Sequence, residues 1–147
     1  MRTHLYTAAM TEPEELRLVE RTPTTEEYRR LRDAVGWNEM TDEGVRAGLS
    51  SALFSVVLER DGEAVGCARV VGDGGIYFYV QDVIVDPELQ GQGWGARLMD
   101  AVMRYLDGAA RAGAFIGLMA AKDVEALYLR YGFERRADDR PGMFRIW

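Results

Sequence analysis

Val83-Ile84-Val85-Asp86-Pro87-Glu88-Leu89-Gln90-Gly91-Gln92-Gly93-Trp94-Gly95 is the stretch that decides the fold of this chain. An apolar strand ends at a proline, alternating glycines follow, and an amphipathic helix begins. Glycines allow a sharp turn and a close approach of the backbone to a ligand. The first N–H groups of a helix lack partners within it, and the aligned peptide dipoles add partial positive charge there. The stretch therefore predicts a backbone cradle for a phosphorylated ligand.

Length and composition are those of one globular domain. The chain has 147 residues, of which 48% are hydrophobic and 29% charged, so we expect a single domain over residues 1–147. Residues 1–13 show no periodicity and are expected to form a disordered leader. The net charge of −6 disfavours a nucleic-acid-binding face. No apolar run approaches the roughly 20 residues that span a membrane, and no secretory signal is visible. These features predict a cytoplasmic protein.

The scarcity of cysteine and histidine excludes several kinds of site. Cys67 is the only cysteine, so an internal disulfide cannot form, as in many proteins of a reducing cytoplasm. His4 is the only histidine. A Ser-His or Cys-His catalytic pair and a His-rich metal site are therefore excluded, and we predict no metal cofactor. Cys67 lies within a predicted strand, where we expect it to be a small buried hydrophobic residue.

The hydrophobic pattern predicts a mixed α/β domain. Asp61-Gly62 and the glycine-rich stretch 72–75 are turn signals, so the strands on either side of them are expected to be antiparallel. Residues 114–121 are continuously apolar, which predicts a strand covered on both faces. We expect a mostly antiparallel central sheet of about six to seven strands with four flanking helices. The predicted elements are strands at 16–19, 53–59, 63–71, 76–85, 114–121, 133–137 and 143–147, and helices beginning at Thr24 or Thr25, Asp42, Gly95 and Asp123.

Three phosphorylated ligands fit a glycine-rich turn before a helix. A nucleoside triphosphate loop requires Lys and Ser or Thr directly after its last glycine, but Ala96 and Arg97 stand there. A dinucleotide fingerprint requires G-x-G-x-x-G within a parallel βαβ unit. Here the glycines run G-x-G-x-G, and the preceding strand belongs to an antiparallel meander. Coenzyme A is the remaining candidate.

Two motifs resemble those of one enzyme superfamily. Residues 90–95, Gln-Gly-Gln-Gly-Trp-Gly, resemble the Q/R-x-x-G-x-G/A signature of the GNAT superfamily of acyl-CoA-dependent N-acetyltransferases. Residues 126–133, Ala-Leu-Tyr-Leu-Arg-Tyr-Gly-Phe, resemble its later motif, in which Gly-Phe follows a helical tyrosine four residues on. The order of the predicted elements over residues 15–147 is also similar. The resemblance implies a GNAT-like sheet splayed between the strands at 76–85 and 114–121.

The resemblance implies acetyl-CoA as cosubstrate and places it on the chain. Its pantetheine arm would pair like an added strand with the backbone from Val83 through Ile84 to Val85. The Val83 N–H would then donate to the thioester oxygen, as in an oxyanion hole. The pyrophosphate would lie on the loop that follows Gln90, on the amides of Gly91, Gln92, Gly93, Trp94, Gly95 and Ala96.

The implied reaction is direct attack of a primary amine on the thioester in a ternary complex. Tyr128 matches the family's tyrosine, which touches the cosubstrate and protonates the leaving thiolate. The group that accepts the amine proton is open. Asp82 is charged within an apolar strand and adjoins Val83, while Glu39 follows the first helix on the expected acceptor side. Ordered water is the third candidate.

Some features depart from the family or leave the acceptor open. Ala121 stands where the family often carries an asparagine, and Lys122 is the candidate replacement for its pantetheine contact. The expected acceptor is a small-molecule or peptide amine, and the predicted strand at 143–147 would offer an edge for a homodimer. The rival interpretations are a non-catalytic acyl-CoA-binding or sensing domain, which would not need Tyr128, and an interaction module whose loop binds nothing.

Overall fold

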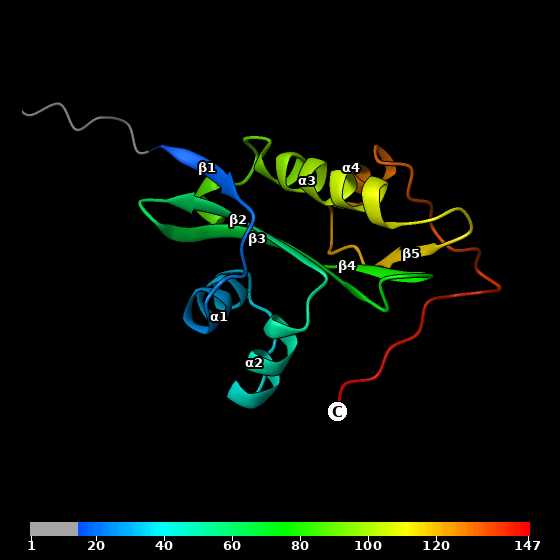
Figure 1. Ribbon diagram of the computed structural model, residues 1–147, viewed down its shortest axis with the longest axis horizontal. Helices are drawn as coiled ribbons and strands as arrows, with labels where there is room; N and C mark the ends of the chain where they lie inside the picture. Colours follow the sequence, from blue (N-terminus) through cyan, green and yellow to red (C-terminus); the bar gives the residue numbers. More distant parts are fainter. Residues whose placement is uncertain (1–14) are drawn as a thin grey trace, which may run out of the picture.

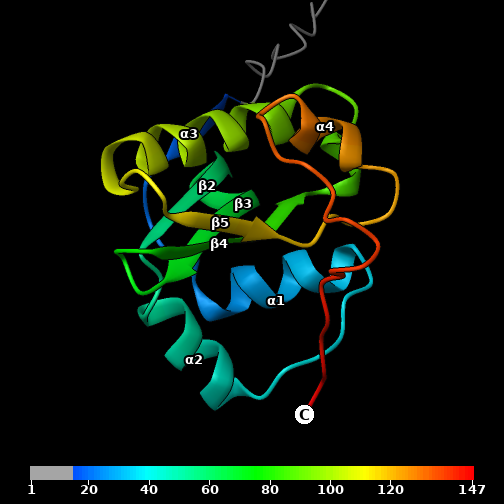
Figure 2. The same ribbon diagram turned by 90° about the vertical axis from the view of Figure 1, so that its right-hand side faces the viewer.

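Helices lie on both faces of one twisted sheet in the computed structural model (Figures 1 and 2). The structure describes residues 15–147, so the predicted leader at 1–13 lies outside the described residues. Helices α3 and α4 cover one face of the sheet, while α1 and α2 cover the other (Figure 2). The elements are β1 (Leu16–Val19), α1 (Thr25–Ala34), α2 (Asp42–Ser50), β2 (Phe54–Arg60), β3 (Glu63–Gly72), β4 (Tyr77–Val85), the 3-10 helix η1 (Pro87–Leu89), α3 (Trp94–Ala109), β5 (Phe115–Leu118) and α4 (Glu125–Leu129).

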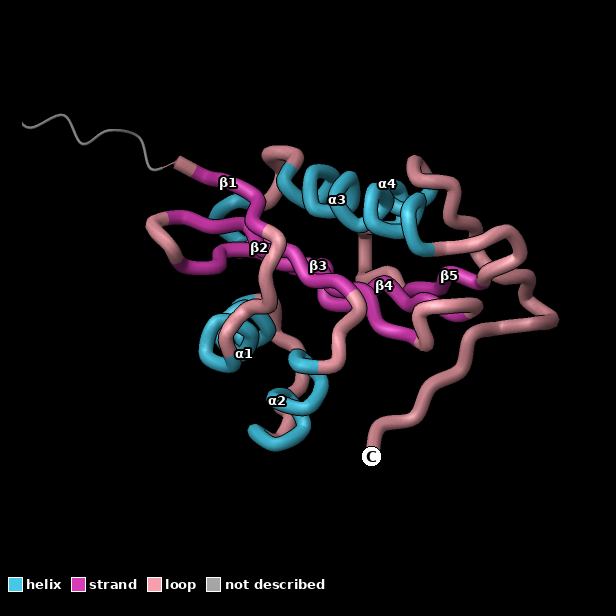
Figure 3. The backbone as a smooth tube through the Cα atoms, in the orientation of Figure 1, coloured by secondary structure: helices cyan, strands magenta, loops and turns pink. Residues whose placement is uncertain are grey.

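The strands follow one another across the sheet in chain order, β1 to β5 (Figure 3). The first four are antiparallel to their neighbours, and β5 adds to β4 in parallel. Asp61 and Gly62 both have positive φ, at 52° and 79°, which is the conformation of a tight hairpin turn. The predicted mixed α/β fold with a mostly antiparallel sheet is confirmed.

The first two helices begin where their capping residues predict. The Thr24 side chain accepts the Glu27 N–H, and the Glu27 carboxylate accepts the Thr24 N–H, which completes a capping box. Thr41 caps α2 through the Gly44 N–H. The buried apolar residues of both helices recur at helical spacing, so each helix presents one apolar stripe toward the sheet or its neighbour. These residues are Tyr28, Leu31, Val45 and Leu49.

The core has two main parts, one on each face of the sheet. The larger part lies under α3, where Leu98, Met99 and Val102 pack against side chains of β2, β3 and β4. The smaller part lies under α1, where Leu31 packs near Cys67. Cys67 is fully buried, and this burial raises the pKa of its thiol to about 12. The thiol is therefore neutral and acts as the predicted small hydrophobic residue.

The C-terminal third differs from the sequence-based expectation. No strand forms at 133–137 or 143–147, so the described sheet has five strands rather than six or seven. A short segment forms a strand only where a paired neighbour satisfies its backbone, and these two segments have no such neighbour among the described residues. Strand β5 is consequently the last strand of the sheet and is partly exposed, not covered on both faces. The homodimer stays a prediction, but the strand at 143–147 that would offer its pairing edge does not form.

Helix α4 also begins later than predicted. Asp123 has a φ of 65° and does not cap the helix, which starts at Glu125 with Val124 before it. A residue in the left-handed region cannot supply the extended conformation of a side-chain N-cap. None of the helices in the described part of the chain is both long and apolar enough to cross a lipid bilayer.

The Glu27 carboxylate fastens α1 to the sheet. Both of its oxygens accept from Arg21, at 2.9 Å each, and it also accepts the backbone N–H groups of Thr24 and Ala64. These donors, with Arg21 first, lower the pKa of Glu27 from 4.5 to about 2. Because the folded-state pKa is depressed, the stabilisation is complete above about pH 4.5 and is lost as the pH falls toward 2.

Glu27→Gln should lower the free energy of unfolding at pH 7 by about 2 kcal/mol, since a buried charged acceptor is lost. The variant should also show a smaller loss of stability than the wild type between pH 4.5 and 2. Urea unfolding at several pH values measures both effects. Identical pH dependence in the two proteins would contradict the role assigned to this carboxylate.

Candidate active site

Strand β4 carries a β-bulge close to its carboxyl end. On β3, one residue separates Cys67 from Arg69, while two residues separate their partners Ile84 and Gln81 on β4. One of those two, Asp82, has a φ of 54°, in the left-handed region. Few residues other than glycine adopt this conformation, and aspartate is one of those that tolerate it best. The structure therefore contains a β-bulge centred on Asp82.

The bulge reverses which residues of β4 face α3. Before it, Phe78 and Val80 belong to the core under α3. After it, Val83 and Val85 pack against that core, whereas Ile84 belongs to the core under α1. One additional residue in a strand shifts its side-chain alternation by one position.

The sheet splays beyond the bulge. Strand β5 pairs with β4 only from Tyr77 to Val80, so the end of β4 has no neighbour on that side. The Asp86 N–H donates to the carbonyl of Val65, which shows that Asp86 directs its backbone groups toward β3. Because alternate residues of a strand bond to opposite sides, Val83 and Val85 direct their backbone groups into the splay. The predicted splay is confirmed.

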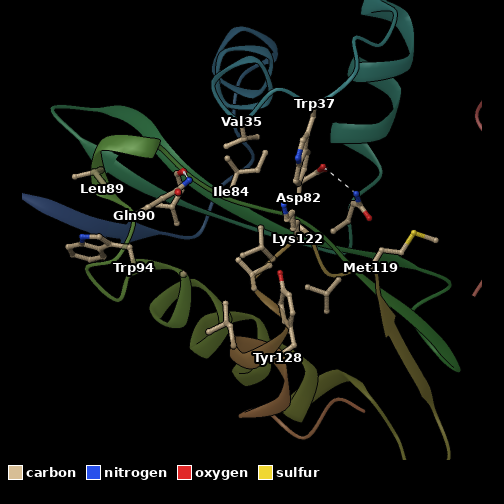
Figure 4. A pocket seen from close by; sticks show the side chains of 18 of the residues that line it. Val35, Trp37, Asp82, Ile84, Leu89, Gln90, Trp94, Met119, Lys122 and Tyr128 are labelled. Carbon is tan, nitrogen blue, oxygen red and sulfur yellow. Dashed lines mark hydrogen bonds between the residues drawn. The ribbon is translucent and has the colours of Figure 1, made fainter. Parts of the chain in front are cut away.

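A cavity of about 560 Å³ occupies this splay (Figure 4). It brings together most of the predicted site residues, from the end of β4, the glycine loop and α4. Three of them, Glu39, Gln92 and Ala96, do not line it. Those that do are Asp82, Val83, Ile84, Val85, Gln90, Gly91, Gly93, Trp94, Gly95 and Tyr128, together with Val35, Trp37, Met119, Ala121 and Lys122.

The glycine loop ends at the exposed N-terminus of α3. Gly91 and Gly93 have φ values of 76° and 87°, which explains the glycine at each position. The first turn of α3 holds no acidic residue and no side-chain cap. The N–H groups of Trp94, Gly95 and Ala96 are therefore free to bind an anion, and the helix dipole favours one there.

Tyr128 extends from α4 toward the middle of the cavity (Figure 4). It is 8% exposed, and burial raises the pKa of its hydroxyl above the usual value of 10. The hydroxyl is therefore protonated at neutral pH and has no hydrogen-bond partner among the described residues. Phe133 packs edge-on against the ring, with centroids 6.3 Å apart. The hydroxyl of Tyr131 lies 2.7 Å from both the Ala96 carbonyl and Asp100 Oδ1, which fixes the end of α4 on α3.

Asp82 lies on the opposite side of the cavity and is held by an ion cluster. Its Oδ2 accepts from the Tyr28 hydroxyl at 3.0 Å and from Arg69 Nε and Nη2 at 2.9 and 2.8 Å. Its Oδ1 accepts from Arg32 Nη1 at 3.3 Å and from Gln81 Nε2 at 3.4 Å. The cluster of Asp82, Arg32, Arg69 and Tyr28 carries a net charge of +1 and is almost fully buried.

The same arginines reach two segments outside the sheet, the connection after α1 and the last turn of α2. Arg32 Nη2 donates to the Asn38 carbonyl at 2.8 Å, and Arg69 Nη1 donates to the Gly48 carbonyl at 3.1 Å. The Arg32 guanidinium also lies over the ring of Trp37, 5.3 Å from its centroid. Sequence reasoning missed both arginines. The available signal was a charged residue inside an apolar strand and another on the buried stripe of α1, four residues after Tyr28.

Glu39, the other predicted proton acceptor, lies elsewhere. It is exposed on the connection between α1 and α2 and lines a separate small hollow beside α1. The structure therefore does not bring it together with Tyr128. Ala121 and Lys122 do line the cavity, and the replacement of the family's asparagine by Lys122 stays a prediction.

Comparison with known proteins gives the family. A family model described as an acetyltransferase (GNAT) domain matches residues 51–135. The chain belongs to the GNAT acetyltransferase family. Among its GNAT relatives, an uncharacterized N-acetyltransferase, ycf52, from Porphyra purpurea is 33% identical over 122 residues, covering 80% of this chain and 69% of that protein.

Two solved structures resemble this GNAT chain closely. One is a protein of unknown function from methicillin-resistant Staphylococcus aureus, described as a probable acetyltransferase. It is 32% identical with a TM-score of 0.86, over 90% of this chain and 100% of that one. The other is a GNAT family acetyltransferase from Streptococcus pneumoniae, 30% identical with a TM-score of 0.72, over 90% and 98% of the two chains.

The glycines of this GNAT loop should respond differently to alanine. A Cβ at Gly93 would meet no atom within 4 Å, so the left-handed backbone alone should cost Gly93→Ala about 1–2 kcal/mol of stability. A Cβ at Gly95 would meet Leu127 Cδ2 at 3.5 Å, an ordinary contact on a helical backbone. Gly95→Ala should therefore gain about 0.5 kcal/mol. Chemical unfolding measures the free energy of unfolding of both variants. Equal changes in the two would contradict the left-handed backbone at Gly93 and the helical backbone at Gly95.

Proposed function

We propose that this GNAT protein transfers an acetyl group from acetyl-CoA to a primary amine by direct attack in a ternary complex. One observation carries the proposal: three sets of unpartnered groups meet at a single cavity. They are the N–H groups at the start of α3, the backbone groups of Val83 with the Val85 N–H, and the hydroxyl of Tyr128. The Val85 carbonyl already accepts from Gln90 Nε2 at 3.0 Å. An acyl-CoA offers an anion, an extended amide chain and a thioester, which match the three sets.

The cosubstrate would lie along the splay. Its pyrophosphate would accept the N–H groups of the loop and of the first turn of α3. Its pantetheine arm would occupy the position beside β4 that a longer β5 would otherwise fill, and would bond to Val83 and Val85. The thioester carbonyl would then accept the Val83 N–H, which stabilises the oxyanion of the tetrahedral intermediate.

The chemical step forms a C–N bond and breaks a C–S bond. A neutral amine attacks the thioester carbon, and the intermediate collapses by expelling the CoA thiolate. The thiolate takes the proton of Tyr128, whose buried hydroxyl is protonated and has no competing acceptor among the described residues. The proton lost by the amine replaces the one that Tyr128 gave up, so the enzyme returns to its initial state.

We propose that water removes the amine proton. Of the two charged residues that line the cavity, Lys122 is a cation and Asp82 already accepts hydrogen bonds at both oxygens. Glu39 lies outside the cavity. Water is therefore proposed in place of the two carboxylates considered from the sequence. The acceptor's identity as a small molecule or a peptide and the cytoplasmic location stay predictions.

Acetyl-CoA should bind the purified protein with a Kd on the order of micromolar, because the free N–H groups of the cradle are already oriented. Calorimetric titration measures this affinity, with NADH as the control for a phosphorylated ligand that does not fit. Failure to bind acetyl-CoA would refute the proposed function and would favour an interaction module.

Tyr128→Phe should lower kcat by about 100-fold and leave the KM for acetyl-CoA nearly unchanged, because only the proton donor is lost. Release of CoA thiol in the presence of an amine gives both constants. Tyr105→Phe is the matched control, since Tyr105 stacks on Phe54 with centroids 4.8 Å apart, away from the cavity, and should keep full activity. Turnover that is unchanged in Tyr128→Phe would remove Tyr128 from the mechanism.

A further inference from the structure

Asp82 directly precedes Val83, whose N–H is the proposed donor to the oxyanion. Its carboxylate lines the cavity, so it has the position of a general base. A base needs a lone pair that is free and directed at the amine. A carboxylate offers about four such sites. Five N–H or O–H contacts from Tyr28, Arg32, Arg69 and Gln81 already reach the two oxygens of Asp82, and the side chain is 1% exposed.

We infer that Asp82 is a positioning residue: its buried ion cluster holds the β4 bulge so that the Val83 N–H faces the thioester. The inference rests on the proposed function. Asp82 has the left-handed φ that the bulge requires, and the two arginines bind its carboxylate from α1 and β3. Rotation of this backbone would move the Val83 N–H, the next peptide along the chain. The cluster therefore fixes the direction of the oxyanion donor.

The same cluster positions the opposite wall of the cavity. Arg32 binds the carbonyl of Asn38 and lies over the ring of Trp37, a lining residue, so the connection after α1 is fixed to the bulge. Arg69 binds the carbonyl of Gly48 at the end of α2. The Asp82 carboxylate thus positions both the oxyanion donor and the acceptor side of the cavity.

The charged and titratable groups facing Asp82 come from every element packed on it. Helix α1 contributes Tyr28 and Arg32, strand β3 contributes Arg69 and the Cys67 thiol, and Lys122 lines the same cavity. A pH profile can therefore separate positioning from base catalysis, because removing one donor weakens stabilisation of the ionised carboxylate.

Asp82→Asn is the first variant. Asparagine tolerates the left-handed conformation, but it leaves the charges of Arg32 and Arg69 uncompensated. Positioning predicts that acetyl-CoA binding weakens at least about tenfold and that kcat falls about 100-fold, because the backbone beside Val83 shifts. A base would contact only the amine, so base catalysis predicts the wild-type Kd for acetyl-CoA. Calorimetry therefore tests the inference without relying on turnover.

Tyr28→Phe is the second variant. It perturbs the cluster less and tests the inference by itself if Asp82→Asn does not fold. It removes one hydrogen bond to Asp82 and leaves both arginines in place. Positioning predicts a lower kcat with the acid limb of the pH–rate profile at its wild-type pH. If Asp82 were the base, loss of this donor would move the acid limb to higher pH. A moved limb, or a wild-type Kd in Asp82→Asn, would overturn the inference.

Glu27→Gln is the matched control, since it also removes a buried carboxylate that binds an arginine on the α1 face. It should lose stability but keep the wild-type kcat and acetyl-CoA affinity, which separates positioning from a general loss of stability. Equal losses of affinity in Glu27→Gln and Asp82→Asn would contradict positioning. Failure of the wild-type protein to bind acetyl-CoA would instead refute the proposed function, before any variant is compared.

Discussion

The bond between the Asp82 carboxylate and two guanidinium groups is the contact on which the site depends. Three buried charges cost several kcal/mol each in lost hydration, and mutual attraction with good hydrogen bonds offsets that cost only when the geometry is well matched. Here Arg69 binds Oδ2 and Arg32 binds Oδ1, and each guanidinium also donates to one backbone carbonyl. Such a cluster contributes less to stability than to specifying one arrangement of α1, β3 and β4.

The bulge that this cluster surrounds has two effects, and both follow from the one additional residue in β4. It changes the side-chain alternation, so that Val83 and Val85 can join the core under α3. It also turns their backbone groups toward the splay rather than another strand, where only the Val85 carbonyl has a partner among the described residues, Gln90 Nε2 at 3.0 Å. Buried backbone groups without partners are costly, and a binding site tolerates them because the ligand supplies the partners. The free N–H groups at the start of α3 follow the same logic a few residues later.

Local rules were enough to predict most elements but not the contacts between them. Thr24 and Glu27 form a capping box that can be read directly from sequence, and the helix predicted to begin at Asp42 is α2. The strands expected at 133–137 and 143–147 do not form, because pairing depends on a neighbouring edge that no local pattern encodes. The glycine cradle was predictable because, like the helix caps, it is formed by residues close together in the sequence. The partners of Asp82 were not, since Tyr28 and Arg32 precede it by 54 and 50 residues.

The two halves of the cavity are therefore built by different contacts. On the α3 face, Tyr131 fixes the end of α4 on the first turns of α3, so the proposed acid Tyr128 and the cradle belong to one unit. On the α1 face, the Asp82 cluster fixes the bulge and the connection that carries Trp37. Strand β4 lies between the two units and lines the cavity from Val80 to Val85. Changes in the connection between α1 and α2 would thus alter the proposed acceptor side while α3 and α4 keep the proposed acetyl-CoA side intact. Acceptor specificity could then vary without a change in the cosubstrate side.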